Sequence, residues 1–188
     1  MGQVTAFILA GGQSRRMGCD KAFAMLEGRT LLQRALDTVR QVTPEVAIVG
    51  AKQKFAEYGL VVEDVYPDSG PLAGIHAALR ASAEELNLVL AVDLAHVSSG
   101  LLRYLVERAR ASTAMVTLPR TLEGWQPLCA VYRKAFAEVA DGALQECRNA
   151  VHALVEDSGP CVIEEAELRR EGFPAEMLRN INRPEDLG

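Results

Sequence analysis

The sequence lacks the features that mark several specialised classes of protein. Its four cysteines form no Cys-x-x-Cys pair and, with the three histidines, no zinc-binding spacing, so a zinc site is not predicted. The 20 lysines and arginines are scattered and the net charge is −5, which argues against a broad nucleic-acid surface. No apolar run is long enough to cross a membrane, and no basic leader is present. These absences predict a soluble, cytoplasmic protein with reduced cysteines.

What the sequence does contain is an ordinary globular composition. Hydrophobic residues make up 49% of the 188 positions, enough apolar material for one sizeable core. We therefore expect one domain spanning residues 1–188. Fifteen glycines and eight prolines are too few for a collagen-like or disordered chain.

Short apolar runs alternate with helical patterns along the chain. Thr30 and the serines at 98–99 are placed to cap two helices, and a further helix face is expected from Leu144 to Leu154 through Cys147. Strands that are apolar throughout and joined by helices predict an α/β fold, a single-domain, three-layer Rossmann-like arrangement with a mostly parallel central sheet. The expected strands lie at 4–10, 46–49, 60–62, 88–92, 114–118, 128–132 and 161–163.

The segment LAGGQSRRMGCDK at 9–21 follows the first expected strand, where ligands bind in such folds. Its three glycines let the backbone approach a ligand, and Arg15, Arg16 and Lys21 bring positive charge suited to a polyphosphate. The spacing matches neither a P-loop nor a dinucleotide-binding fingerprint. A solvated connection between strand and helix is the alternative to a binding loop.

Acidic residues follow two other expected strands. Asp93 comes after the most apolar run of the chain, where a carboxylate needs a partner such as Mg²⁺ or an N-capping role. The same alternatives apply to Glu63, Asp64 and Asp68. The three histidines form no ligand pair and are interpreted as surface or structural residues.

These motifs together resemble those of molybdenum cofactor guanylyltransferases, a branch of the nucleotidyltransferase superfamily. Residues 9–21 are similar to the LAGGxSxRMGxDK signature of that family, and DSGPLAG at 68–74 is similar to its GPLAG segment. Further matches are Asp93, the PLCAVY stretch at 127–132 and NINRPEDL at 180–187. They occur in family order and span nearly the whole chain.

The resemblance implies a nucleotidyltransferase fold and Mg²⁺-dependent transfer of GMP from GTP to molybdopterin, with release of pyrophosphate. It implies that Lys21 contacts phosphate, and Lys21 and Arg16 would offset charge on the pyrophosphate. Asp64 would help to hold GTP, and Asp93 would bind Mg²⁺. The remaining implied residues are Leu9, Ala10, Gly11 and Gly12 along the nucleotide, and Asn180 and Asn182 at the pterin substrate.

The resemblance also implies partners and leaves alternatives open. GTP and molybdopterin would be the small-molecule substrates, and molybdoenzyme maturation proteins would be partners, with no nucleic acid and no membrane. The chain has Asp93-Leu94-Ala95 where the family usually has Asp-x-Pro, and Gly50 where a nucleotide-contacting polar residue is expected. Cytidylyl transfer to molybdopterin, nucleotidyl transfer to a sugar phosphate and an inactive nucleotide-binding homologue are therefore the alternatives.

Overall fold

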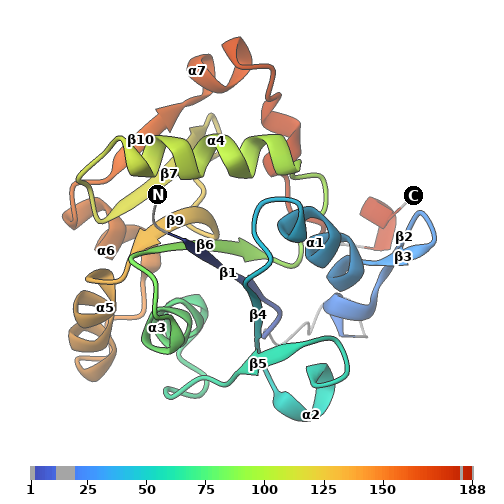
Figure 1. Cartoon of the computed structure of the whole chain (residues 1–188), viewed down its shortest axis with the longest axis horizontal. Helices are drawn as coiled ribbons and strands as arrows, with labels where there is room; N and C mark the ends of the chain where they lie inside the picture. Colours follow the sequence, from blue (N-terminus) through green and yellow to red (C-terminus); the bar gives the residue numbers. More distant parts are fainter. Residues whose placement is uncertain (1–2, 12–19, 183, 188) are drawn as a thin grey trace.

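A central sheet covered by helices on both faces forms the molecule (Figure 1). The structure, a computed structural model, describes residues 3–11, 20–182 and 184–187. It confirms the expected three-layer α/β fold with a mostly parallel sheet. In the described part of the chain, every helix is too short or too polar to span a bilayer.

The main sheet has the strand order β10-β7-β9-β6-β1-β4-β5, with β8 paired to β7. β1 pairs in parallel with β4 and β6, whereas β9 is antiparallel to both of its neighbours. A separate hairpin joins β2 (Met25–Leu26) to β3 (Arg29–Thr30). The strands of the main sheet are β1 (Val4–Leu9), β4 (Val46–Val49), β5 (Leu60–Val62), β6 (Leu86–Ala91), β7 (Val116–Thr121), β8 (Gly124–Trp125), β9 (Cys129–Arg133) and β10 (Cys161–Glu164).

Local sequence signals explain where two of the helices begin. Thr30 and Gln33 form a capping box at the start of α1, and Ser98 caps α4, as the sequence predicts. The helices are α1 (Leu31–Arg40), α2 (Lys52–Phe55), α3 (Pro71–Ala81), α4 (Ser99–Arg110), α5 (Phe136–Gln145), α6 (Val151–Asp157) and α7 (Glu165–Arg170). Short 3₁₀ turns are η1 (Lys21–Phe23), η2 (Ala175–Leu178) and η3 (Pro184–Leu187).

The core lies in two layers, one on each face of the sheet. Successive strand residues point to opposite faces, so Ile8 and Leu88 pack under α1 and α4. Phe7 and Val89 pack on the other side, under α3 and α5. Because both faces are covered, the central strands are mainly apolar rather than alternating, and Asn87 of β6 is a buried polar exception.

The helix expected through Cys147 is two helices, so that prediction is wrong. α5 ends at Gln145, and Cys147 adopts a positive φ of 58°. The Arg148 N–H donates to the Ala143 carbonyl at 2.8 Å, which closes the hydrogen-bonded turn that typically ends a helix. The chain therefore turns before α6 begins, although apolar residues keep a helical spacing across the break.

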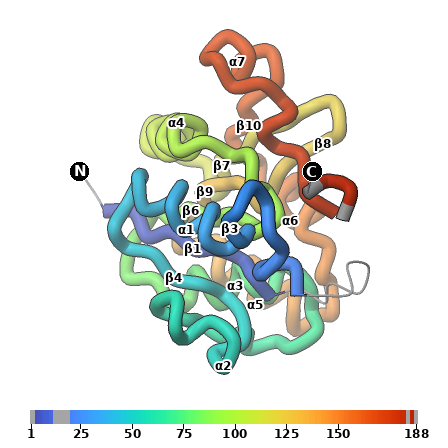
Figure 2. Tube along the Cα trace, turned by 90° about the vertical axis from the view of Figure 1, so that its right-hand side faces the viewer, coloured from blue at the N-terminus to red at the C-terminus, as the bar shows by residue number. Residues whose placement is uncertain are grey.

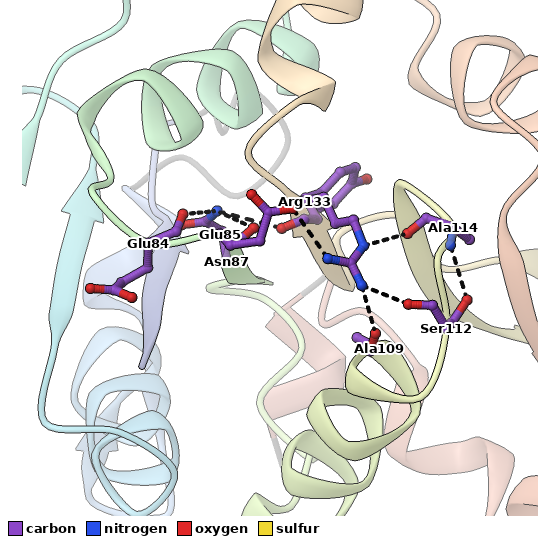
Figure 3. Close-up of polar contacts among 8 residues, drawn as sticks. Glu84, Glu85, Asn87, Ala109, Ser112, Ala114 and Arg133 are labelled. Carbon is purple, nitrogen blue, oxygen red and sulfur yellow. Dashed lines mark hydrogen bonds and ion pairs between the residues drawn. The ribbon is translucent and has the colours of Figure 1, made fainter. Parts of the chain in front are cut away.

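Arg133, the last residue of β9, contacts the end of α4 and the residue before β6 at the edge of the sheet where β6 begins (Figure 3). Its guanidinium donates to the carbonyls of Ala109 and Ser112 at 3.3 and 2.6 Å, which satisfies groups left open at the end of α4. It also donates to the Ala114 carbonyl at 3.2 Å and pairs with Glu85 at 3.1 Å. These contacts fix α4, β9 and the start of β6, and leave the opposite edge for a ligand.

Candidate functional site

Four neighbouring strands end at one edge of the sheet and form the floor of the candidate site. The N–H groups of Ala10 and Gly11 both donate to the Val49 carbonyl, at 3.0 and 3.1 Å. The Gly50 N–H donates to the Val62 carbonyl at 2.9 Å, which links the ends of β4 and β5. β6 lies on the other side of β1, so the residues after all four strands meet at this edge.

Lys21 joins two distant parts of the chain at this edge. Its Nζ donates to Asp93 Oδ2 at 2.7 Å and to Asn182 Oδ1 at 3.0 Å. The preceding residue, Asp20, accepts a hydrogen bond from the Ala22 N–H and so caps the 3₁₀ turn that carries Lys21. Figure 2 shows the C-terminal stretch returning toward this segment. Three residues singled out from the sequence therefore lie together.

The second carboxylate oxygen of Asp93 has no partner among the described residues. Asp93 Oδ1 is buried and makes no hydrogen bond, while the side chain as a whole is 19% exposed. Ser98 rather than Asp93 caps α4, so the capping alternative is wrong for Asp93. An orphaned buried carboxylate oxygen is costly unless a cation or donor occupies its neighbourhood. Asp93 thus presents a carboxylate oxygen that could hold a metal ion.

The backbone after Asp93 forms hydrogen-bonded turns although it lacks the proline that the resemblance predicts at position 95. The Leu94 N–H donates to the Ala91 carbonyl at 3.2 Å, and the Val97 N–H donates to the Leu94 carbonyl at 3.2 Å. The side chains of Leu94 and Ala95 are 3% and 9% exposed, so both are anchored in the core. Burial and two successive turns therefore fix this loop.

A cavity of about 890 Å³ lies over the ends of β1, β4 and β5, at the same edge of the sheet as the Lys21 cluster, although Lys21, Asp93 and Asn182 are not part of its lining. Its lining includes Asp64 at the end of β5 and Lys54 on α2. The complete described lining is Ala10, Gly11, Gly50, Ala51, Lys54, Phe55, Glu63, Asp64, Pro67, Asp68, Gly70 and Pro71. Its size and its mixture of apolar walls with a few charged groups are typical of a site for a small molecule.

Burial shapes the electrostatics of the cavity wall. Desolvation raises the pKa of the Asp64 carboxyl above 3.8, and the positive charge of His76 partly opposes the rise. His76, on α3, is 3% exposed, and its burial lowers the pKa of its imidazole below 6.5 against the opposing effect of Asp141. Its Nε2 lies 3.3 Å from Asp141 Oδ1, but the geometry is not that of a hydrogen bond, so neither ring nitrogen has a hydrogen-bond partner within the described part of the chain.

Some of the other expected site residues are described by the structure, and they differ in how close they lie to the Lys21 cluster and the cavity. The Leu9 side chain is 8% exposed and packs in the core, so only its backbone faces the edge of the sheet. Asn180 is exposed and lines a separate cavity of about 460 Å³ that also contains His96. Gly12 and Arg16 lie outside the described residues. The sequence-based roles of these residues stay predictions.

Three residues have positions that sequence reasoning missed or left open. Glu63 accepts a hydrogen bond from the Lys52 N–H at 3.0 Å, so it caps α2. His76 is fully covered, whereas His96 and His152 are exposed. Lys54 reaches the cavity from a helix that carries no recognisable motif. The available signal was its place just after Gly50, at a strand end.

Comparisons with known proteins agree with this geometry. A family model described as MobA-like NTP transferase domain matches residues 6–160. The molybdenum cofactor guanylyltransferase of Desulfosudis oleivorans is 34% identical over 191 residues, covering 100% of this chain and 94% of that one.

Two solved structures share the fold. Molybdopterin-guanine dinucleotide biosynthesis protein A of Archaeoglobus fulgidus superposes with a TM-score of 0.84 at 26% identity, covering 97% of this chain and 94% of that one. The 2-C-methyl-D-erythritol 4-phosphate cytidylyltransferase of Thermus thermophilus has a TM-score of 0.71 at 20% identity, covering 100% and 96%. The second likeness concerns the fold alone.

Proposed function

This chain belongs to the MobA-like NTP transferase family, and we propose that it transfers GMP from GTP to molybdopterin, releasing pyrophosphate and forming molybdopterin guanine dinucleotide. The observation that carries the proposal is the cluster of Lys21, Asp93 and Asn182 at the same edge of the sheet as the 890 Å³ cavity. The cluster supplies a cation, a carboxylate with an orphaned oxygen and an amide. The cavity supplies room for a nucleoside.

The strand order supports a placement for the nucleotide. Asp93 follows β6 and Asp64 follows β5, and these strands are three positions apart in the sheet. Three spacings between strands amount to about 14 Å, which suits an extended nucleoside triphosphate. The phosphates then lie at Lys21 and Asp93, and the ribose and base lie in the cavity at Asp64. The backbone at Leu9, Ala10 and Gly11, with Gly12 beyond the described residues, runs along the nucleotide.

The residues present fit a magnesium ion. The orphaned Oδ1 of Asp93 is a hard oxygen ligand, and Mg²⁺ is commonly held by one or two carboxylates together with substrate phosphates and water. No group of three or more metal-ligating side chains occurs in the described ranges, so Asp93 would be the protein's main ligand. The ion would neutralise charge on the phosphates.

The proposal also assigns roles to Lys21 and to the residues expected near molybdopterin, the acceptor of GMP. Lys21 would donate to phosphate oxygens and offset charge on the departing pyrophosphate, a role that Arg16 would share from outside the described residues. The attacking group is a phosphate monoester, already anionic near neutral pH, so positioning and charge neutralisation matter more than a general base. Asn180 and Asn182 would contact the pterin, which brings the acceptor next to Lys21.

The proposal also covers the domain organisation, the cellular location and the partners of the protein. We infer that the whole chain acts as one domain, that it works in the cytoplasm and that its product passes to molybdoenzyme maturation proteins. None of these features alters the chemistry at Lys21 and Asp93.

The test is pyrophosphate release from GTP with molybdopterin and Mg²⁺. We expect Asp93→Asn and Lys21→Ala each to lower kcat by about 100-fold to 1,000-fold, the usual effect of removing one group that stabilises developing charge. Asp157→Asn, an exposed carboxylate at the end of α6, is the control and should retain activity. Full activity of Lys21→Ala would remove the central claim.

The same assay separates the alternatives. Turnover with CTP in place of GTP would keep the fold and the reaction but make the protein a cytidylyltransferase. Turnover only when a sugar phosphate replaces molybdopterin would change the acceptor. Nucleotide binding without pyrophosphate release from any pair of substrates would indicate an inactive homologue.

A further inference from the structure

The cavity over the ends of β1, β4 and β5 is lined by more side chains that accept hydrogen bonds than side chains that donate them. Among the described residues that line it, Lys54 is the one side chain that carries a hydrogen-bond donor. Three carboxylates line the same cavity, and one of them, Glu63, is engaged in capping α2. Asp64 stands at the end of β5 within the lining. The side chains of the described lining therefore offer a ligand one donor, Lys54, and several carboxylate acceptors.

Lys54 combines a fixed backbone with an adjustable side chain. The neighbouring Phe55 is 1% exposed, and its ring stacks on Phe23 with centroids 5.7 Å apart, so α2 is anchored against η1. The Lys54 side chain is itself 56% exposed and pairs with Asp20, Nζ to Oδ2, at 2.8 Å. An ion pair with so exposed a lysine contributes little to stability. Lys54 can thus exchange Asp20 for a ligand at low cost.

The packing of Phe55 also explains why the part of the cavity wall after β4 has a glycine at position 50. A Cβ built on Gly50 would lie 2.7 Å from Phe55 Cε2, closer than real contacts allow. The ring of Phe55 occupies the space that a side chain would need. A side-chain contact from this wall to a nucleobase therefore has to come from Lys54, one helical position before that ring.

We propose that Lys54 determines base specificity by donating to the O6 and N7 acceptors of guanine, while Asp64 accepts from guanine N1–H and N2–H. The inference rests on the proposed function, because it assumes that the base lies in this cavity. Guanine presents two adjacent acceptors on one edge and two adjacent donors on another, and lysine is a common partner of O6 and N7. Cytosine and adenine do not offer two adjacent donors to one carboxylate.

The strand order argues against the phosphates as the target of Lys54. α2 follows β4, on the far side of β1 from β6 and from Asp93. Lys21 already provides a cation beside Asp93. Lys54 lines the same cavity as Asp64, where the proposed placement puts the base.

The test is calorimetric binding of GTP, 7-deaza-GTP, CTP and ATP with Mg²⁺ and no acceptor. Wild-type protein, Lys54→Met and the control Lys52→Met are compared, because Lys52 is exposed on the same helix and is not part of the cavity lining. We expect wild type to prefer GTP by tenfold or more. Lys54→Met should weaken GTP binding by about tenfold, with CTP and ATP little affected, and Lys52→Met should change nothing. In wild type, 7-deaza-GTP should bind more weakly than GTP because it lacks the N7 acceptor.

The outcomes separate this inference from the proposed function. Equal losses for GTP, CTP and ATP in Lys54→Met would mean that Lys54 acts on the phosphates, and this would overturn the inference. An unchanged preference for GTP in Lys54→Met would overturn it as well. Asp20→Asn should keep the preference for GTP, and loss of it there would indicate that Lys54 acts through Asp20. A wild type that prefers CTP would instead overturn the guanylyl function itself.

Discussion

At the scale of single residues, the contact between Lys21 and Asp93 shows how the site depends on partly buried charge. The two side chains are 17% and 19% exposed, so water screens their attraction less than at the surface. Removing one member of such a pair leaves the other charge desolvated and without its partner, which is destabilising. Activity losses in Lys21→Ala and Asp93→Asn therefore need to be read beside their unfolding free energies.

His76 carries a prediction about pH at the same scale. Burial holds its pKa below 6.5, so between the folded and unfolded values the unfolded chain binds a proton that the native chain does not. The stability contributed by neutral His76 is therefore present above pH 6.5 and is lost as the pH falls through the folded pKa. We expect the thermal midpoint to fall between about pH 7.5 and about pH 5.5, and to fall less in His76→Leu.

A matched comparison isolates His76 from the other titrating groups. Asp64 acts in the opposite sense, since its pKa is raised and its contribution is lost as the pH rises through the folded value. Because His76 lowers the pKa of Asp64, the difference between wild type and variant reports His76 together with its interaction with Asp64. His152→Gln, at an exposed histidine on α6, should keep the wild-type profile. An identical pH profile for His76→Leu and wild type would contradict the argument.

At the scale of elements, the break between α5 and α6 is the clearest case of local strain. Cys147 is exposed and sits at φ 58°, a left-handed conformation that costs about 1–2 kcal/mol for residues other than glycine. Cys147→Gly should therefore raise the unfolding free energy by about 1 kcal/mol, measured by urea denaturation. Cys147→Ala keeps the Cβ and should give no such gain. A gain of the same size in both variants would point to loss of the thiol rather than relief of strain.

Elements were predictable where their signals are local. The caps at Thr30 and Ser98 are short-range patterns, and the structure confirms both. The end of α5 was not predictable in the same way, because cysteine rarely ends a helix and the apolar spacing continues past it. The Arg133 contacts join residues up to 48 positions apart, so no local window contains them.

At the scale of the whole molecule, topology made the site partly predictable. The rule that ligands bind beyond the carboxyl ends of parallel strands directed attention to the residues after β1, β5 and β6. Lys21, Asp93 and Asn182 meet there because the C-terminal stretch returns to that edge. Lys54 was missed, and His76 was left open between a surface and a structural role, because the Phe23–Phe55 and His76–Asp141 contacts join residues far apart in the sequence.

The same topology predicts that the substrate stabilises the whole fold. In the proposed placement, a nucleotide lying from Asp93 to Asp64 would bridge the ends of β6, β1, β4 and β5, so it would bind only the folded chain. GTP with Mg²⁺ at 100 times its Kd should add about 2.7 kcal/mol to the unfolding free energy, or on the order of 5–10 °C in Tm for a chain of this size. Chelating Mg²⁺ with EDTA should remove much of the shift in wild type, and Asp93→Asn should show a small shift that EDTA does not change. A shift in Asp93→Asn that equals wild type and responds equally to EDTA would mean that the metal binds elsewhere, and the carboxylate would then serve only to orient Lys21.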